Sequence, residues 1–239
     1  MIRYSMIVAV GLLGFISMSQ ADEAAIRQSV EQNMPGVAVD RITPTPLDGL
    51  YEVRSGTDVV YMSADGKYLF TGDLIDLSAR ENLTEAVRSA IRAEIINALD
   101  PKDMIVFPAK GERKYSITVM TDHTCPYCIR LHEELPDLNA AGVEVRYLLT
   151  PRHGEQSQVF EDSSKILCAK DRVKAIDEAI KNQQVSGKAC ADDLVREHMR
   201  LAEMMGMTGT PFIITDSGVV IPGYRPAADL VRILEATSR

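Results

Sequence analysis

The tetrapeptide Cys125-Pro126-Tyr127-Cys128 constrains the fold of this chain more than any other feature. It follows an apolar segment, residues 115–120, that has the composition of a buried strand, and it opens a segment with helical periodicity. Proline suits the first position of a helix, because its φ is already helical and its missing N–H would have no partner there. The sequence therefore predicts a strand that leads directly into a helix whose first turn carries both thiols.

This placement makes the two thiols unequal. The unpaired amides and the positive dipole end of a helix stabilise a thiolate at Cys125 and lower its pKa. Cys128 lies one turn further in, so we expect it to be more buried and to stay protonated. We therefore predict that Cys125 is the nucleophile that attacks a disulfide and that Cys128 is the resolving thiol. No cofactor is expected beyond this redox-active pair.

Other uses of these residues stay open at this point. Cys125, Cys128 and His132 have the spacing C-x2-C-x3-H of metal ligands, although a structural zinc site needs a fourth ligand that the sequence does not offer, so no metal is expected. A purely structural Cys125–Cys128 disulfide would close a ring too short to constrain the unfolded chain much. His123 could tune the thiolate, but exposure on a loop is the expected role.

The remaining cysteines, Cys168 and Cys190, lie within a long predicted helical stretch, residues 155–206, and do not follow a strand. Nothing in that setting favours a reactive thiolate. We predict that they form a structural disulfide, whose closed loop stabilises the fold by roughly 3 kcal/mol in the chain-entropy estimate.

The first 21 residues differ from the rest of the chain. Arg3 precedes an apolar run at residues 6–16, and Ser19 and Ala21 provide the small residues of a cleavage site, so 1–21 is predicted to be a signal peptide removed before Asp22. The run is too short to span a bilayer, which needs about 20 residues. Export implies an oxidising compartment. The mature chain keeps 25 basic and 34 acidic residues, a formal charge of −9, which argues against nucleic acid as a partner.

Residues 22–77 are predicted to form a small α+β domain. A short helix ends at Pro35-Gly36, and strands are expected at 50–54, 59–62 and 67–71, with Asp65-Gly66 as the turn between the last two. A unit of this size struggles to stabilise itself through one core, so dimerisation is expected.

Residues 78–100 are predicted to be a linker helix. Ser78-Ala79-Arg80-Glu81 has the form of a capping box, and apolar residues follow at i, i+4 spacing up to Leu99. A semi-rigid connector is the first interpretation, and an ordinary core helix of the following domain is the alternative.

Residues 101–239 have the element order of an α/β domain. A strand at 115–120, the cysteine helix and a strand at 143–149 form a βαβ unit, and the helical stretch, a hairpin over 212–221 and a last helix from Pro226 follow it. This is the plan of a thioredoxin-like domain that carries a helical insertion.

An ordered set of short motifs gives a more specific indication. These motifs are Asp65-Gly66-Lys67, the octapeptide 121–128, the segments 145–148 and 167–171, Gly209-Thr210-Pro211 and Pro222-Gly223-Tyr224. Together they resemble the periplasmic disulfide isomerases of the DsbC and DsbG type over essentially the whole mature chain.

The resemblance implies a homodimer, joined through the N-terminal domains, whose cleft holds misfolded disulfide-containing exported proteins. It also implies a membrane thiol reductase of the DsbD type as the electron donor. Within the site, it implies that Pro211 is a cis-proline facing both sulfurs and that the Thr210 backbone pairs with extended substrate. Pro126 and Tyr127 are the remaining supporting residues of the active site.

One position departs from the pattern. DsbC-like members usually carry glycine where this chain has Pro126, and DsbG-like members carry proline. The flanking segments favour the DsbC side, so a disulfide isomerase and reductase is the first hypothesis. A dithiol oxidase and a DsbG-like reductase of sulfenylated cysteines with chaperone activity are the alternatives, and the redox state of Cys125 and Cys128 in the cell separates isomerase from oxidase.

Overall fold

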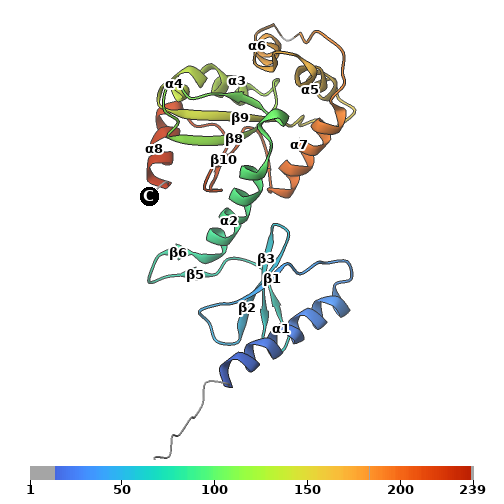
Figure 1. The fold of residues 1–239 in the computed structure, drawn as a ribbon, viewed down its shortest axis with the longest axis vertical. Helices are drawn as coiled ribbons and strands as arrows, with labels where there is room; N and C mark the ends of the chain where they lie inside the picture. Colours follow the sequence, from blue (N-terminus) through green and yellow to red (C-terminus); the bar gives the residue numbers. More distant parts are fainter. Residues whose placement is uncertain (1–13, 183, 238–239) are drawn as a thin grey trace, which may run out of the picture. The chain divides into compact units, whose positions relative to one another are not determined.

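The protein is described here by a computed structural model, which describes residues 14–182 and 184–237 (Figure 1). The chain divides into two compact units, residues 1–85 and 86–239. Most of the predicted signal peptide, residues 1–13, lies outside the described residues, and residues 14–21 are helical. Among the described residues, no helix is both long enough and apolar enough to cross a membrane.

The first unit packs one helix on an antiparallel sheet. Its elements are α1 (Gly14–Asn33), β1 (Arg41–Pro44), β2 (Leu50–Ser55), β3 (Asp58–Ser63) and β4 (Leu69–Phe70). The strands pair in the order β1-β2-β3-β4, so β1 and β4 form the two edges. Ile26 and Val30 of α1 pack on Tyr51, Val53 and Met62 of the sheet. The predicted helix and the three predicted strands are confirmed, whereas β1 was not predicted.

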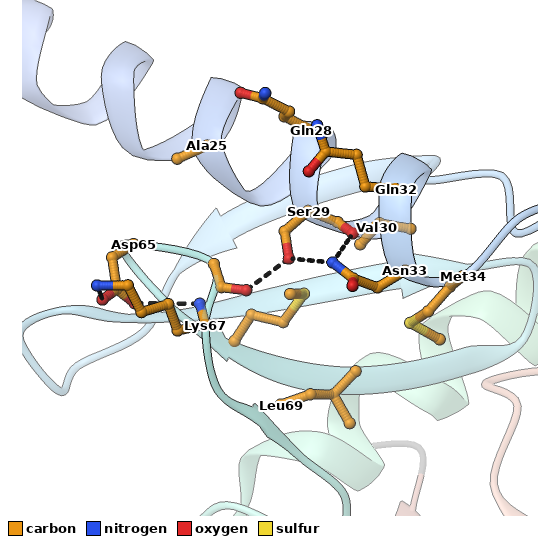
Figure 2. A pocket seen from close by; sticks show the side chains of 12 residues that line it. Ala25, Gln28, Ser29, Val30, Gln32, Asn33, Met34, Asp65, Lys67 and Leu69 are labelled. Atoms are coloured by element: carbon orange, nitrogen blue, oxygen red, sulfur yellow. Dashed lines mark hydrogen bonds and ion pairs between the residues drawn. The ribbon is translucent and has the colours of Figure 1, made fainter.

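The turn between β3 and β4 lies directly against α1. Gly66 has a φ of +69°, and a Cβ there would lie 2.9 Å from the Ala25 carbonyl oxygen and 2.9 Å from the Ser29 Cβ. The Ser29 hydroxyl donates to the Gly66 carbonyl at 2.6 Å. Figure 2 shows Ser29 pointing from α1 towards the turn beside Asp65, where helix and turn line a groove of about 510 Å³. Glycine is therefore required at this turn both by its backbone and by its close packing.

The helix expected from Ser78 begins later. The Asp76 carboxylate accepts from the backbone N–H groups of Ser78 and Ala79 and from the Ser78 hydroxyl, and Arg80 has a φ of 56°. These residues form the turn of a small hairpin between β5 (Ile75–Asp76) and β6 (Glu81–Asn82). The capping-box interpretation is therefore wrong, because the local Asp76 carboxylate takes the amides that a capped helix would need.

The helix itself, α2 (Leu83–Ala98), begins at Leu83, and the side-chain oxygen of the preceding Asn82 accepts from the Glu85 N–H at 2.9 Å. Thr84 is fully buried in the first unit, where its hydroxyl bonds the Tyr61 hydroxyl and accepts from the Leu74 N–H.

The second unit is built on a five-stranded mixed sheet in the order β11-β10-β8-β9-β7. The strands are β7 (Ile105–Phe107), β8 (Tyr115–Thr121), β9 (Val143–Leu149), β10 (Phe212–Thr215) and β11 (Val220–Pro222). Only the β8–β9 pair is parallel among these neighbours. The βαβ unit and the hairpin are confirmed, and the edge strand β7 is an addition that the sequence did not indicate.

Helices enclose this sheet, and successive strand residues face opposite sides of it. Val119, Leu149 and Ile213 belong to one core, whereas their neighbours Met120 and Leu148 belong to another. The helices of this unit are α3 (Pro126–Glu133), α4 (Leu135–Ala140), α5 (Gln158–Cys168), α6 (Arg172–Asn182), α7 (Asp192–Met204) and α8 (Ala227–Thr237), with the short η1 (Pro101–Asp103) before β7. Helices α5, α6 and α7 form the predicted insertion between β9 and β10 (Figure 1).

The later turns of α2 pack within this second unit. Ile96 is 2% exposed in the core that also contains Met120 and Leu148. The turn between β10 and β11 fits closely on the helix, because a Cβ on Gly218 would lie 1.8 Å from the Ser89 carbonyl oxygen. Arg92 donates to the Gly218 carbonyl at 3.2 Å.

Candidate redox site

The cysteine motif begins α3 as predicted. Cys125 is the N-cap residue in an extended conformation, and Pro126 is the first helical residue. The Cys125 carbonyl accepts from the Ile129 N–H at 2.9 Å, while the Cys125 N–H donates to the Asp122 carbonyl at 2.9 Å. Cys125 and Cys128 are free thiols, and their exposed fractions are 2% and 1%. We expected Cys128 to be the more buried of the two, but exposed area barely separates the two cysteines.

Their pKa values do separate them. Burial opposes ionisation of Cys125, but the Thr210 side chain and the N–H groups of Cys128 and Tyr127 stabilise its thiolate, so its pKa falls below the ordinary 9.0. Burial dominates at Cys128 and raises its pKa to about 11, despite favourable contacts with the Asp122 N–H and the side chain of Thr121. The arrangement gives one thiol that ionises readily and one that does not.

The Thr210–Pro211 peptide bond is cis, as the resemblance implied. The Cys125 thiol donates to the Thr210 carbonyl oxygen with an Sγ–O distance of 3.4 Å. The Thr210 hydroxyl is buried and has no hydrogen-bond partner among the described residues while Cys125 is a thiol. It is therefore available to a thiolate.

A buried carboxylate beside the cysteines was missed by the sequence analysis. The Asp122 side chain is fully buried and accepts from the N–H and hydroxyl of Thr124 and from the N–H and Nε of Arg152. Burial opposes the charge, but these four donors together lower the pKa of Asp122. The aspartate three residues before Cys125 was the available signal, because Asp after a strand commonly accepts from the amide two residues ahead.

His123 is 6% exposed, so the expectation of an exposed loop histidine is wrong. Burial lowers its pKa, although the charges of Asp122 and Asp162 act in the opposite direction. Its neighbour Asp122 accounts for the burial, since the bonds to Arg152 draw this loop towards the segment after β9.

An aromatic surface borders the cysteines. The Tyr127 side chain is 56% exposed, stacks on Tyr224 with 6.3 Å between ring centroids, and lies beneath the guanidinium of Arg130. The Tyr224 hydroxyl donates to Glu134, which also accepts from the Ala227 N–H. The Tyr127 ring is therefore exposed to solvent and stacks on the ring of Tyr224, whose hydroxyl is bound by Glu134.

His132 has its polar partner on α6. Its Nε2 lies 2.9 Å from the Asp177 Oδ1 on α6. Among the described residues, no group of three or more His, Cys, Asp and Glu side chains is arranged to hold a metal ion.

The structural pair lies apart from this chemistry. Cys168 is the last residue of α5, and it forms a disulfide with Cys190, which precedes α7, with a Cα–Cα distance of 5.8 Å.

A thioredoxin-like sheet with two unequal thiols at a helix N-terminus, opposite a cis-proline, defines the class of thioredoxin-type thiol:disulfide oxidoreductases. Residues 17–85 match the disulfide bond isomerase protein N-terminal domain, and residues 101–238 match the thioredoxin-like domain. The chain belongs to the DsbC family of thiol:disulfide interchange proteins.

Full-length relatives support that assignment. The chain is 39% identical to thiol:disulfide interchange protein DsbC of Dickeya dadantii, over 94% of this chain and 91% of the relative. It is 36% identical to DsbC of Escherichia coli, over 94% and 92%. A crystal structure of Proteus mirabilis ScsC in a transitional conformation has a TM-score of 0.52 at 17% identity, covering 64% of this chain and 81% of that one, which shows the shared fold alone.

Proposed function

We propose that this chain is a periplasmic protein-disulfide isomerase and reductase in which Cys125 attacks a substrate disulfide and Cys128 resolves the mixed disulfide. The inequality of the two thiols carries this proposal: Cys125 has a lowered pKa at the open end of α3, and Cys128 has a pKa of about 11. A readily formed thiolate starts the exchange, and a protonated thiol waits while substrate sulfurs rearrange.

Trapping variants test this division of labour. Cys128→Ala should accumulate covalent complexes with substrate at Cys125, because intramolecular release is lost, whereas Cys125→Ala should trap almost none. Complexes are counted on non-reducing gels of the exported protein. Accumulation in the Cys125→Ala variant instead would overturn the assignment.

The redox state in the cell distinguishes isomerase from oxidase. An isomerase needs Cys125 as a thiol, which in an oxidising compartment requires an electron donor, for which we propose a membrane thiol reductase of the DsbD type. Thiol trapping of the exported chain should find Cys125 and Cys128 reduced, and a fully oxidised pair would favour a dithiol oxidase.

We also propose that the working form is a homodimer joined through residues 22–77. The two edges of the first sheet differ: β1 contains Arg41 and ends at Pro44, which disfavour pairing, whereas Leu69 and Phe70 of β4 are 41% and 54% exposed. An exposed apolar edge strand is suited to pairing with a second copy.

Phe70→Lys tests this interface, and Leu47→Lys, at an exposed leucine outside the strands, is the matched control. Light scattering should show that only Phe70→Lys is monomeric. That monomer should keep reductase activity on a small disulfide and lose most isomerase activity, because nothing holds the substrate while its sulfurs reshuffle. A monomer with full isomerase activity would contradict the proposal.

A further inference from the structure

Two tyrosines and two arginines form an exposed surface beside Cys125, and the thiol exchange itself does not use the arginines. Tyr127 lies on the first turn of α3, and its ring stacks on that of Tyr224 at an interplanar angle of 24°. The Arg130 guanidinium lies over the Tyr127 ring, 5.7 Å from its centroid, and Arg225 donates to the Tyr224 carbonyl at 3.2 Å. We call these four residues the tyrosine–arginine surface.

The two arginines carry the uncompensated charge of this surface. Both side chains are exposed, and neither forms an ion pair with any residue that the structure describes. Arg152, the other arginine near the cysteine motif, is already paired with the buried Asp122 carboxylate. The surface therefore presents positive charge to solvent, although the chain as a whole is acidic.

The acidic side chains of the same region are placed differently. Glu134 is half-buried, and its two oxygens accept from the Tyr224 hydroxyl and the Ala227 N–H. Glu133 is the last residue of α3, about two turns beyond the cysteine motif, and Asp229 forms its ion pair within α8. None of these acids pairs with either arginine of the surface, so a carboxylate from a bound partner would meet unpaired cations there.

Helix geometry directs Arg130 towards the reactive end of α3. Residues three apart lie on the same face, and helical side chains lean towards the N-terminus, so Arg130 extends back over Tyr127 towards the turn that Cys125 begins. A guanidinium stacked on an aromatic ring keeps the N–H groups around its edge free for a carboxylate. Contact with Tyr127 also orders the Arg130 side chain in advance, which reduces the entropy that binding costs.

We propose that the tyrosine–arginine surface selects substrates that carry an acidic residue beside the cysteine that Cys125 attacks. This inference rests on the proposed function, in which that cysteine becomes bonded to Cys125. Neighbouring Cα atoms of a chain are about 3.8 Å apart, so the residues that flank the substrate cysteine come within reach of Tyr127 and Arg130. The rings contact the apolar stem of a flanking side chain, and an arginine pairs with its carboxylate.

Peptide disulfides of graded charge test this selection. Each peptide has one cysteine, flanked by Glu, Gln or Lys and bonded to the same uncharged aromatic thiol. The Cys125 thiolate attacks the peptide sulfur, a bond forms between these two sulfurs, and the aromatic thiol leaves as a thiolate whose absorbance is followed by stopped flow. Each rate is divided by the rate with a small neutral thiol, which removes the intrinsic reactivity of the peptide.

The parent protein should react about three- to fivefold faster with the Glu peptide than with the Gln peptide, and most slowly with the Lys peptide. Salt at about 1 M should remove most of this preference, because it screens exposed charges. Arg130→Gln together with Arg225→Gln should abolish the preference, whereas Arg130→Lys should keep part of it, since the charge remains. Arg113→Gln is the matched control, because Arg113 is an exposed arginine before β8, at the opposite end of that strand from the cysteine motif.

The outcomes are distinct. Equal normalised rates for the three peptides with the parent, or a parent-like preference in the double variant, would overturn the proposal. Equal slowing of all three peptides by Arg130→Gln would also overturn it, because the arginine would then act on the Cys125 thiolate and not on the peptide. A parent protein that releases no aromatic thiolate from any peptide would contradict the proposed function instead. Both arginines are exposed, so these variants should fold as the parent does.

Discussion

Cys125 and Cys168 both lie at the end of a helix, but at opposite ends. Cys125 precedes the first turn of α3, whereas Cys168 is the last residue of α5. The positive end of a helix dipole stabilises a thiolate and the negative end opposes one. The same side chain therefore serves exchange in one place and a lasting bond with Cys190 in the other, and the backbone around it makes the difference.

Alkylation gives the largest expected effect and tests the reactive side of this comparison. Because Cys125 ionises with a pKa below 9.0 and Cys128 with a pKa of about 11, the thiolate fraction of Cys125 near neutral pH should exceed that of Cys128 by about 100-fold or more. Mass spectrometry after a short iodoacetamide pulse should find the label on Cys125. In denaturant the two cysteines should react alike, and equal labelling of the folded protein would remove the basis of the comparison.

Removing the other pair should affect stability and not exchange. Cys168→Ala together with Cys190→Ala frees a loop closed across 22 positions, so the free energy of unfolding should fall by roughly 3 kcal/mol. Urea unfolding measures this loss. Interchange activity per folded molecule should stay within about twofold of the parent. A large loss of activity at unchanged stability would mean that the second pair takes part in the chemistry.

A buried histidine on α7, the helix that follows Cys190, predicts how the stability of the protein depends on pH. The Nδ1 of His198 accepts from the Leu149 N–H, so its Nε2 donates to the Asp103 carbonyl, and the neutral ring is fully paired. Burial lowers its pKa to about 4. The unfolded chain, with a pKa near 6.5, binds the proton first, so stability falls as pH drops from about 6.5 towards 4.

The loss from His198 should be about 2 kcal/mol between about pH 7 and 5. The measurement is the difference in urea unfolding between the parent and His198→Gln at several pH values, which cancels the shared carboxylates. His153→Gln, at an exposed histidine, should keep the parent's pH dependence. Equal slopes for the parent and His198→Gln would show that this ring does not control acid stability.

The smallest effect is expected at the exposed ring beside Cys125. Tyr127→Ala removes the stacking on Tyr224 and an aromatic contact for substrate, which should slow reduction of protein disulfides about fivefold, or about 1 kcal/mol. Reduction of a small aliphatic disulfide, followed by thiol release, should barely change. Equal slowing of both substrates would place the effect on the thiols themselves.

The sequence was sufficient where the signal was local. Strand, cysteine pair and helix are adjacent in the chain, so Pro126 at the first helical position and the N-cap place of Cys125 could be read directly. The cis bond at Pro211 came from family resemblance, since no local pattern distinguishes a cis proline.

Long-range contacts could not be predicted in the same way. Asp122 meets Arg152 across 30 residues, and His132 meets Asp177 across 45, so each pair is joined only by the fold. At Ser78 the local pattern was misleading, because a capping box and a turn closed by Asp76 use the same polar residues.

The close fit of Gly218 on α2 has a consequence for how this chain can be divided. Residues 86–98 belong to the second unit, where Ile96 is part of a core and Arg92 holds the β10–β11 turn. A chimera that exchanges modules after residue 100 would replace half of that packing with foreign side chains. A crossover near Glu85 keeps each module's core with its own sequence, so successful recombinants should have their junctions there.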